Sequence, residues 1–308
     1  MSSEIDGLVI GKQGADYVVA TDAGEMRCSP RGRFRLADDP EESLPVVGDL
    51  VRVQLGGDAG ESAGVVVSIS PRRTRFVRTD PSGKRRYRLI GANLDRVLIV
   101  LAAREPAFNA RLLDRMLVAA ECGGMEPVIV VNKIDLVAQE DPPPPAVYEE
   151  LGYAVLRCSA ATGEGIEAVR DVVREWRSIL AGPSGSGKTS IIAALEPGLE
   201  LRIGRVSDRT GKGRHTTTHF SLHALSVGGW IGDTPGIREF GIWGVSQRTL
   251  GEYFREFEPF LGRCRFSPCT HSHEPQCAVK EAVAAGRITA GRHESYLRIL
   301  ETLPERLS

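Results

Sequence analysis

The sequence predicts an α/β protein whose central domain is flanked by a small β-barrel and by a helical segment that carries cysteine and histidine. Three observations support this fold class. From Arg96 onward, short apolar strands alternate with helical stretches, which is typical of a doubly wound parallel sheet. Residues 1–70 instead hold short apolar stretches broken by Gly and Asp turns. Near the C-terminus, three of the six cysteines fall within fourteen residues.

Length and composition indicate a globular protein of two or three domains. The 308 residues are 42% hydrophobic and 26% charged, so the chain can bury sizeable cores without a disulfide framework. A net charge of −1 excludes a uniformly basic nucleic-acid coat protein. The first residues lack a leader pattern, and the longest apolar run, about Val97–Ala103, is too short for a membrane helix. We therefore expect a soluble, cytoplasmic protein with no membrane contact.

The first segment, residues 1–70, is predicted to form a five-stranded, OB-like barrel. It holds twelve acidic and six basic residues, a net charge of −6. The apolar stretches that predict its strands are Leu8–Ile10, Tyr17–Ala20, Leu50–Leu55 and Val65–Ile69.

Residues 71–90 follow as a basic linker. Between residues 71 and 88, eight Lys and Arg residues accompany only Asp80, a net charge of +7. Such a cluster can bind a phosphate backbone, or it can be a solvated linker that its own charge extends.

The α/β domain is predicted over residues 91–243 and a helical domain over residues 244–308. The expected strands of the first are Val97–Leu101, Val128–Val131, Ala154–Arg157 and Ser178–Ala181, and its expected helices are Asn109–Cys122 and Glu164–Arg177. The expected helices of the second are Glu252–Phe260, Ala278–Ala285 and His293–Leu303.

A phosphate-binding loop follows the strand Ser178–Ala181. The run Gly182-Pro-Ser-Gly-Ser-Gly-Lys-Thr matches the P-loop pattern, and a helical stretch comes directly after it. Its glycines allow backbone N–H groups to surround phosphate oxygens, while Lys188 reaches the β- and γ-phosphates and Thr189 binds Mg²⁺. The loop predicts a nucleotide without saying which one, since nucleotide kinases and transport ATPases have similar loops. The expected phosphate-loop residues are Gly182, Pro183, Ser184, Gly185, Ser186, Gly187, Lys188, Thr189 and Ser190.

Two further motifs at strand ends predict that the base is guanine. In Asn132-Lys-Ile-Asp135, the carboxylate of Asp135 can accept both N1–H and the exocyclic amine of guanine, which adenine does not offer. Asn132 can serve the other base edge, and the stem of Lys133 can cover the ring. In Cys158-Ser159-Ala160, the backbone N–H of Ala160 can bond guanine O6.

The γ-phosphate end is predicted at Asp233-Thr-Pro-Gly236. Asp233 would hold Mg²⁺ through water, and the N–H of Gly236 would sense the γ-phosphate. The preceding Gly213-Arg-His-Thr-Thr-Thr218 offers Thr217 as a further Mg²⁺ ligand, or alternatively starts a strand at Thr216–Thr218. The guanine motifs precede the phosphate loop, the reverse of the order in Ras-like GTPases, so the domain is predicted to be circularly permuted.

A metal knuckle is predicted at Cys264-x4-Cys269-x-His271-x5-Cys277. Three thiolates and one imidazole suit one tetrahedral, structural Zn²⁺. The alternatives are His273 as a competing ligand, or buried cysteines without a metal.

Together these features resemble the RsgA/YjeQ family of circularly permuted bacterial GTPases. The resemblance rests on residues 132–136, 182–190 and 233–241 and on the cysteine knuckle, and it covers nearly the whole chain. It implies an OB-fold, a P-loop GTPase domain and a zinc domain. It also implies GTP hydrolysis, with Mg²⁺, in late maturation of the small ribosomal subunit, which stimulates hydrolysis and whose rRNA is bound. We expect a monomer.

The catalytic water has no Gln to orient it, because Ile237 follows Gly236 where Ras-like enzymes place one. We therefore expect slow intrinsic turnover, with Lys188 and Thr217 neutralising charge and His215 orienting the water. His215 can alternatively contact RNA or pack in the switch. Arg205, Arg209 and Arg214 are candidates for stabilising the transition state. The alternative functions are large-subunit assembly and a scaffold that holds nucleotide and RNA without hydrolysis.

Overall fold

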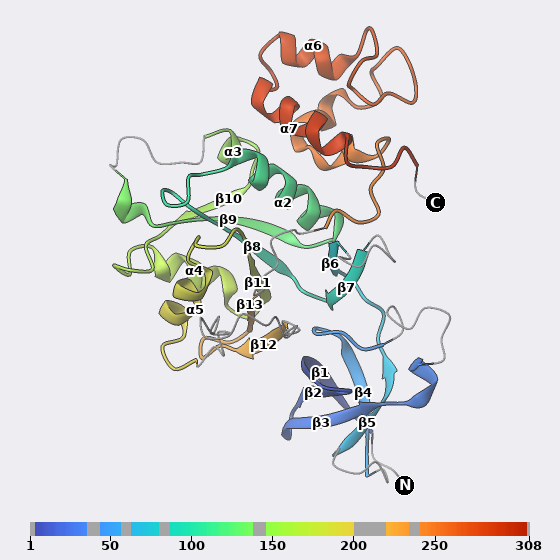
Figure 1. Cartoon of the computed structure of the whole chain (residues 1–308), viewed down its shortest axis with the longest axis vertical. Helices are drawn as coiled ribbons and strands as arrows, with labels where there is room; N and C mark the ends of the chain where they lie inside the picture. The colour runs from blue at the N-terminus through green and yellow to red at the C-terminus, as the bar shows by residue number, and fades with distance from the viewer. Residues whose placement is uncertain are drawn as a thin grey trace, which may run out of the picture.

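The structure is a computed structural model, and it describes residues 4–35, 44–56, 63–79, 87–137, 146–199, 220–233 and 241–306. These residues form a barrel, a central α/β domain and a C-terminal helical region. The barrel and the helical region lie at opposite ends of the α/β domain (Figure 1). None of the helices in these ranges is long and apolar enough to cross a membrane.

The N-terminal strands close into a barrel of the OB type, as the sequence predicts. They are joined in the order β1-β2-β3-β5-β4, with β4 returning to pair with β1. All pairs are antiparallel except β3 with β5. Buried Val9, Tyr17, Val53 and Val66 fill the interior. The strands are β1 (Glu4–Gln13), β2 (Asp16–Thr21), β3 (Gly24–Pro30), β4 (Leu50–Leu55) and β5 (Gly64–Ile69), with a 3₁₀ turn, η1 (Gly32–Arg35), after β3.

The basic segment after the barrel contains regular structure. β6 (Arg75–Thr79) and β7 (Tyr87–Ala92) pair as a two-stranded antiparallel sheet. Phe76 is fully buried, and its ring lies 5.9 Å from that of Phe220 in the α/β domain. Burial of this aromatic pair holds β6 against the α/β domain, so these residues are more than an extended linker.

The central sheet has six strands in the order β10-β9-β8-β11-β13-β12, and only the edge strand β12 is antiparallel. β12 also lies beside strand β1 of the barrel, where Gly11 neighbours Ser221. The strands are β8 (Arg96–Ala102), β9 (Glu126–Asn132), β10 (Ala154–Arg157), β11 (Arg177–Ala181), β12 (Ser221–Ala224) and β13 (Trp230–Asp233).

Helices cover both faces of this sheet because alternate residues of its strands are apolar on each side. In β8, Val97, Ile99 and Leu101 pack with α2 and α3, while Leu98 and Val100 pack with α4 and α5. The predicted helix Glu164–Arg177 is too long. The chain leaves helical geometry at Arg174, and Glu175 has a positive φ of 63°. The helices are α2 (Ala110–Cys122), α3 (Val147–Glu150), α4 (Ile166–Val173) and α5 (Lys188–Leu195), and a 3₁₀ turn, η2 (Ile134–Leu136), follows β9.

The C-terminal region packs its last helix against α2. The predicted α-helix Glu252–Phe260 is wrong, because two 3₁₀ turns stand there. Phe254 between them is extended, and Pro259 cannot donate a helical hydrogen bond. The predicted helices Ala278–Ala285 and His293–Leu303 correspond to α6 and α7. The elements are η3 (Leu250–Tyr253), η4 (Arg255–Phe260), α6 (Ala278–Ala284) and α7 (Ala290–Leu300).

Candidate functional site

The predicted nucleotide motifs meet at one edge of the central sheet. The guanine motif follows β9, Ser159 and Ala160 follow β10, and the phosphate loop follows β11. These three strands are parallel, so their carboxyl ends share an edge, which is where open α/β sheets bind ligands. Asp233 ends β13 at the same edge. His215, Thr217 and Gly236 lie outside the described residues, as do Arg205, Arg209 and Arg214.

Two glycines of the phosphate loop leave no room for a side chain. Gly182 has a φ of +150°, and a Cβ there would lie 2.1 Å from the carbonyl oxygen of Val100. A Cβ on Gly187, whose φ is +92°, would lie 2.1 Å from Nδ2 of Asn132. The loop is therefore held close to its neighbours, and its backbone can surround an anion.

Lys188 is the first residue of α5, and it folds back over this loop. Its Nζ donates to the carbonyl oxygens of Gly182 and Pro183, each at 2.9 Å. Thr189 and Ser190 occupy the first turn of the same helix. The ammonium group is thereby held at the mouth of the loop, beside the positive end of α5, in an arrangement that suits a nucleotide's phosphates.

Asn132 ties the three motif loops together. Its Nδ2 donates to the carbonyl oxygen of Ser186 at 2.9 Å, and its Oδ1 accepts the N–H of Ala160 at 3.0 Å. The side chain is 2% exposed, so both ends are used within the protein. The sequence predicts that Asn132 and the Ala160 N–H face the base edge, and in the structure these two groups also bond to each other. Asn132 is a clamp between the guanine loops and the phosphate loop.

The guanine motif itself is open. Lys133 adopts a left-handed conformation with a φ of 65°, and its Nζ donates to the carbonyl oxygen of Glu105. Asp135 is exposed, and within the described ranges its carboxylate makes no hydrogen bond or ion pair. An exposed carboxylate with no partner among the described residues is available to accept donors from a base.

The loop after β8 also borders this pocket, and the sequence analysis missed it. The carbonyl oxygen of Glu105 accepts the bond from Lys133, and Cδ of Pro106 lies 3.7 Å from where a Cβ on Gly185 would stand. No motif marks this loop in the sequence; its place follows from the sheet order, in which β8 lies between β9 and β11 and its carboxyl end meets the same edge.

The cysteine knuckle brings four potential ligands together. Cys264, Cys269, His271 and Cys277 place their ligand atoms within 4.8 Å of one another. The sulfurs of Cys264 and Cys277 are 3.8 Å apart, and Nδ1 of His271 is 3.5 and 3.4 Å from them. Ligands about 2.3 Å from a tetrahedral metal ion would stand about 3.8 Å from each other. The geometry therefore fits a metal ion, and His273 is outside the group.

Neighbouring side chains hold the knuckle in this shape. The hydroxyl of Tyr296 donates to the carbonyl oxygen of Thr270 at 2.7 Å, and Nε2 of His293 lies 3.1 Å from the carbonyl oxygen of His271. Burial lowers the pKa of His271, which keeps the ring neutral, and raises the pKa of Cys269 to about 12. The thiol of Cys269 therefore ionises at neutral pH only beside a cation, so the donor chemistry also suits a metal.

A buried ion-pair network joins this region to the α/β domain. The guanidinium of Arg292, 3% exposed on α7, pairs with Asp114 of α2 and with Glu256, whose Oε1 is 2.7 Å from Nε. The hydroxyl of Tyr148 donates to Asp114 at 2.7 Å. The network links α2, α3, η4 and α7, so it fixes the C-terminal region on one face of the sheet.

The α/β sheet brings a P-loop and a guanine motif together, and the guanine motif comes first along the chain. This combination defines the class of the protein, which is a circularly permuted GTPase. A family model described as RsgA GTPase matches residues 69–243. The chain belongs to this family and is a GTPase, as its sequence predicts.

The relatives match the whole chain. The chain is 43% identical to a protein of Gemmatimonas aurantiaca named small ribosomal subunit biogenesis GTPase RsgA, over 98% of this chain and 99% of that one. A Moorella thermoacetica protein of the same name is 39% identical over 96% of each. Among solved structures, YjeQ from Thermotoga maritima has a TM-score of 0.77 at 31% identity, covering 99% of this chain and 100% of that one. YloQ, described as a circularly permuted GTPase, has a TM-score of 0.74 at 26% identity, covering 97% and 95%.

Proposed function

We propose that this protein hydrolyses GTP to GDP and phosphate when stimulated by the small ribosomal subunit, and that it acts in late maturation of that subunit while bound to its rRNA. The observation that carries the proposal is the Asn132 clamp, which joins both guanine loops to the phosphate loop. The relatives that share nearly the whole chain are named small ribosomal subunit biogenesis GTPases. The protein works as a cytoplasmic monomer.

The pocket works by positioning GTP. Asp135 selects guanine, the glycine loop holds the phosphates, and Lys188 leaves its loop carbonyls to pair with the β- and γ-phosphates. Thr189, Thr217 and Asp233 would hold Mg²⁺, which would supply positive charge to neutralise the phosphates. The N–H of Gly236 senses the γ-phosphate. His215 orients the attacking water, and no residue of the pocket forms a covalent bond to the substrate.

The knuckle holds one structural Zn²⁺ on Cys264, Cys269, His271 and Cys277. All four ligand positions come from the protein, so the ion organises the irregular chain between η4 and α6 and takes no part in hydrolysis. The neutral imidazole and the tight spacing of the thiols support this assignment.

Phosphate release from GTP, measured alone and with purified small or large subunits, tests the proposal. We expect slow release alone and an increase only with small subunits. Stimulation by large subunits alone would favour a role in large-subunit assembly. No hydrolysis under any condition would favour a scaffold that holds nucleotide and RNA. The variant His215→Ala should lose the stimulated rate while GTP binding stays, and intact stimulation would disprove the role of His215.

A further inference from the structure

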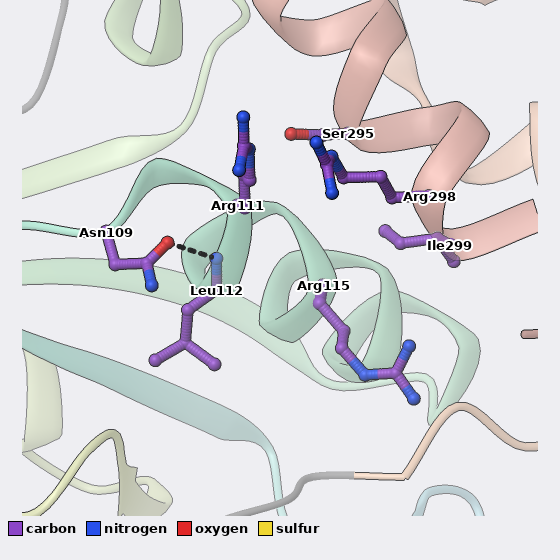
Figure 2. Close-up of a pocket in the computed structure, with 7 residues that line it drawn as sticks. All are labelled: Asn109, Arg111, Leu112, Arg115, Ser295, Arg298 and Ile299. Carbon is purple, nitrogen blue, oxygen red and sulfur yellow. Dashed lines mark hydrogen bonds between the residues drawn. The ribbon is translucent and has the colours of Figure 1, made fainter.

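A cleft of about 340 Å³ lies between helix α2 of the α/β domain and helix α7 of the C-terminal region. Arg111 and Arg115 line it from α2, and Arg298 lines it from α7 (Figure 2). Leu112 and Ile299 also line the cleft and add apolar surface to it. None of these residues belongs to the nucleotide pocket or the metal knuckle.

The cleft carries more positive charge than its surroundings neutralise. Arg111 and Arg298 share one carboxylate, with Oε1 of Glu294 at 2.9 Å from Nη2 of each. Arg115 donates only to a neutral hydroxyl, that of Thr302 at 3.2 Å, and it has no ion pair in the described part of the chain. The first turn of α2 contains no acidic residue. Three guanidinium groups against one carboxylate leave an excess positive charge.

This arrangement suits an extended polyanion. Guanidinium groups pair with phosphate oxygens through two parallel hydrogen bonds. The side chains of Arg111 and Arg298 are 57% and 54% exposed, so they can reach phosphates that pass over the cleft. A single exposed anion would gain little from such groups, whereas a chain of phosphates releases one counterion for each contact.

We propose that this cleft binds the phosphate backbone of RNA and holds it with arginines from both regions. The inference rests on the proposed function, in which the RNA is the rRNA of the small subunit. Because α2 and α7 also carry the Arg292–Asp114 pair, RNA across the cleft would bind the two helices in the relative position that this pair fixes. We do not expect the cleft to distinguish RNA sequences, because contacts to the phosphate backbone carry no direct information about the bases.

The variant Arg111→Gln/Arg115→Gln/Arg298→Gln tests the cleft in the full-length protein. Binding to small subunits, in the presence of a non-hydrolysable GTP analogue, is measured over a series of salt concentrations. We expect binding about tenfold or more weaker, and a slope of log affinity against log salt reduced by about 2 to 3, since each phosphate contact contributes about 1. The matched control is Arg174→Gln, an exposed arginine that is paired with Asp171 on the other face of the sheet. It should leave both quantities unchanged.

The outcomes separate this inference from the function on which it rests. If the wild-type protein is stimulated and the triple variant binds with unchanged affinity and salt slope, the cleft proposal is overturned and the proposed function stands. If the wild-type protein binds neither small subunits nor isolated ribosomal RNA, both are overturned. Hydrolysis without subunits should be equal in all variants, which also shows that the variant pocket is intact.

A photo-crosslinking residue in place of Arg298 identifies the partner directly. Irradiation of the complex with small subunits should attach the protein to rRNA. Attachment to ribosomal protein alone would overturn the assignment to RNA.

Discussion

The nucleotide pocket and the metal knuckle organise their ligands in opposite ways. The pocket lies at the edge of a sheet whose core is buried on both faces, and backbone glycines and the Asn132 clamp shape it. The knuckle lies in irregular chain between η4 and α6, where four side chains converge. The central sheet shapes the first site, whereas on the proposed function a bound metal ion would hold the second together.

This difference predicts how the loss of each ligand site affects activity and stability. GTP binds a pocket that is formed in its absence, so substitutions in the pocket should lower the rate of hydrolysis more than the stability of the fold. The ligands of the knuckle lie in irregular chain that a few side-chain hydrogen bonds hold, so removal of a bound metal ion should affect stability first. The predictions below test this contrast in order of expected size.

Removing the metal should have the largest effect on stability. Treatment with a strong chelator, or Cys277→Ser, should cost of the order of 10 kcal/mol of local stability in the knuckle. Metal content should fall from one ion per chain, and hydrogen exchange should rise over residues 261–278. The control is Cys122→Ser, a thiol outside the knuckle. Slow hydrogen exchange in a metal-free knuckle would show that the knuckle keeps its fold without a metal ion, which would contradict the proposed difference between the two sites.

Lys188→Ala should greatly slow GTP hydrolysis while leaving the fold intact. The lysine donates to two loop carbonyls in the structure, whereas in the proposed reaction it faces phosphate charge. Turnover should fall by about 10²–10³-fold with a melting temperature close to that of the wild type. Lys12→Ala in the barrel is the matched control. Turnover within about twofold of the wild type would contradict the role of Lys188.

Loss of the buried Arg292 ion pair, which joins the α/β domain to the C-terminal region, should lower the free energy of unfolding. Arg292→Met leaves Asp114 and Glu256 buried without their partner, which should cost about 3–5 kcal/mol in denaturant unfolding. Arg298→Met on the same helix breaks an exposed pair and should cost less than about 1 kcal/mol. Equal costs would mean that the Arg292 network does not join the regions.

Local patterns explain what could be predicted from the sequence. The phosphate loop, the guanine motifs and the cysteine spacing are each contiguous, so their residues could be assigned before the fold was known. The barrel strand β3 was missed because Met26 and Cys28 alternate with charged Glu25 and Arg27, which gives only a weak apolar pattern. The two 3₁₀ turns were predicted as one helix because composition does not show the extended conformation of Phe254.

Contacts between distant segments explain what could not be predicted. Arg292 and Asp114 are 178 residues apart, so nothing in either local sequence pairs them. The bond from Asn132 to Ser186 joins residues 54 positions apart, so the guanine motif alone does not predict it. The arginine cleft likewise exists only where α2 meets α7.

The most direct test of the account is a change of substrate specificity at Asp135. Xanthine carries an oxygen where guanine carries the exocyclic amine, so Asp135→Asn exchanges an acceptor for the donor that xanthine needs. Phosphate release is measured with small subunits on GTP and on xanthosine triphosphate. The account predicts that the wild type hydrolyses GTP. In the variant, phosphate release from GTP should fall by about tenfold or more, and xanthosine triphosphate should be hydrolysed instead. A variant that still prefers GTP, with stimulation intact, would contradict it.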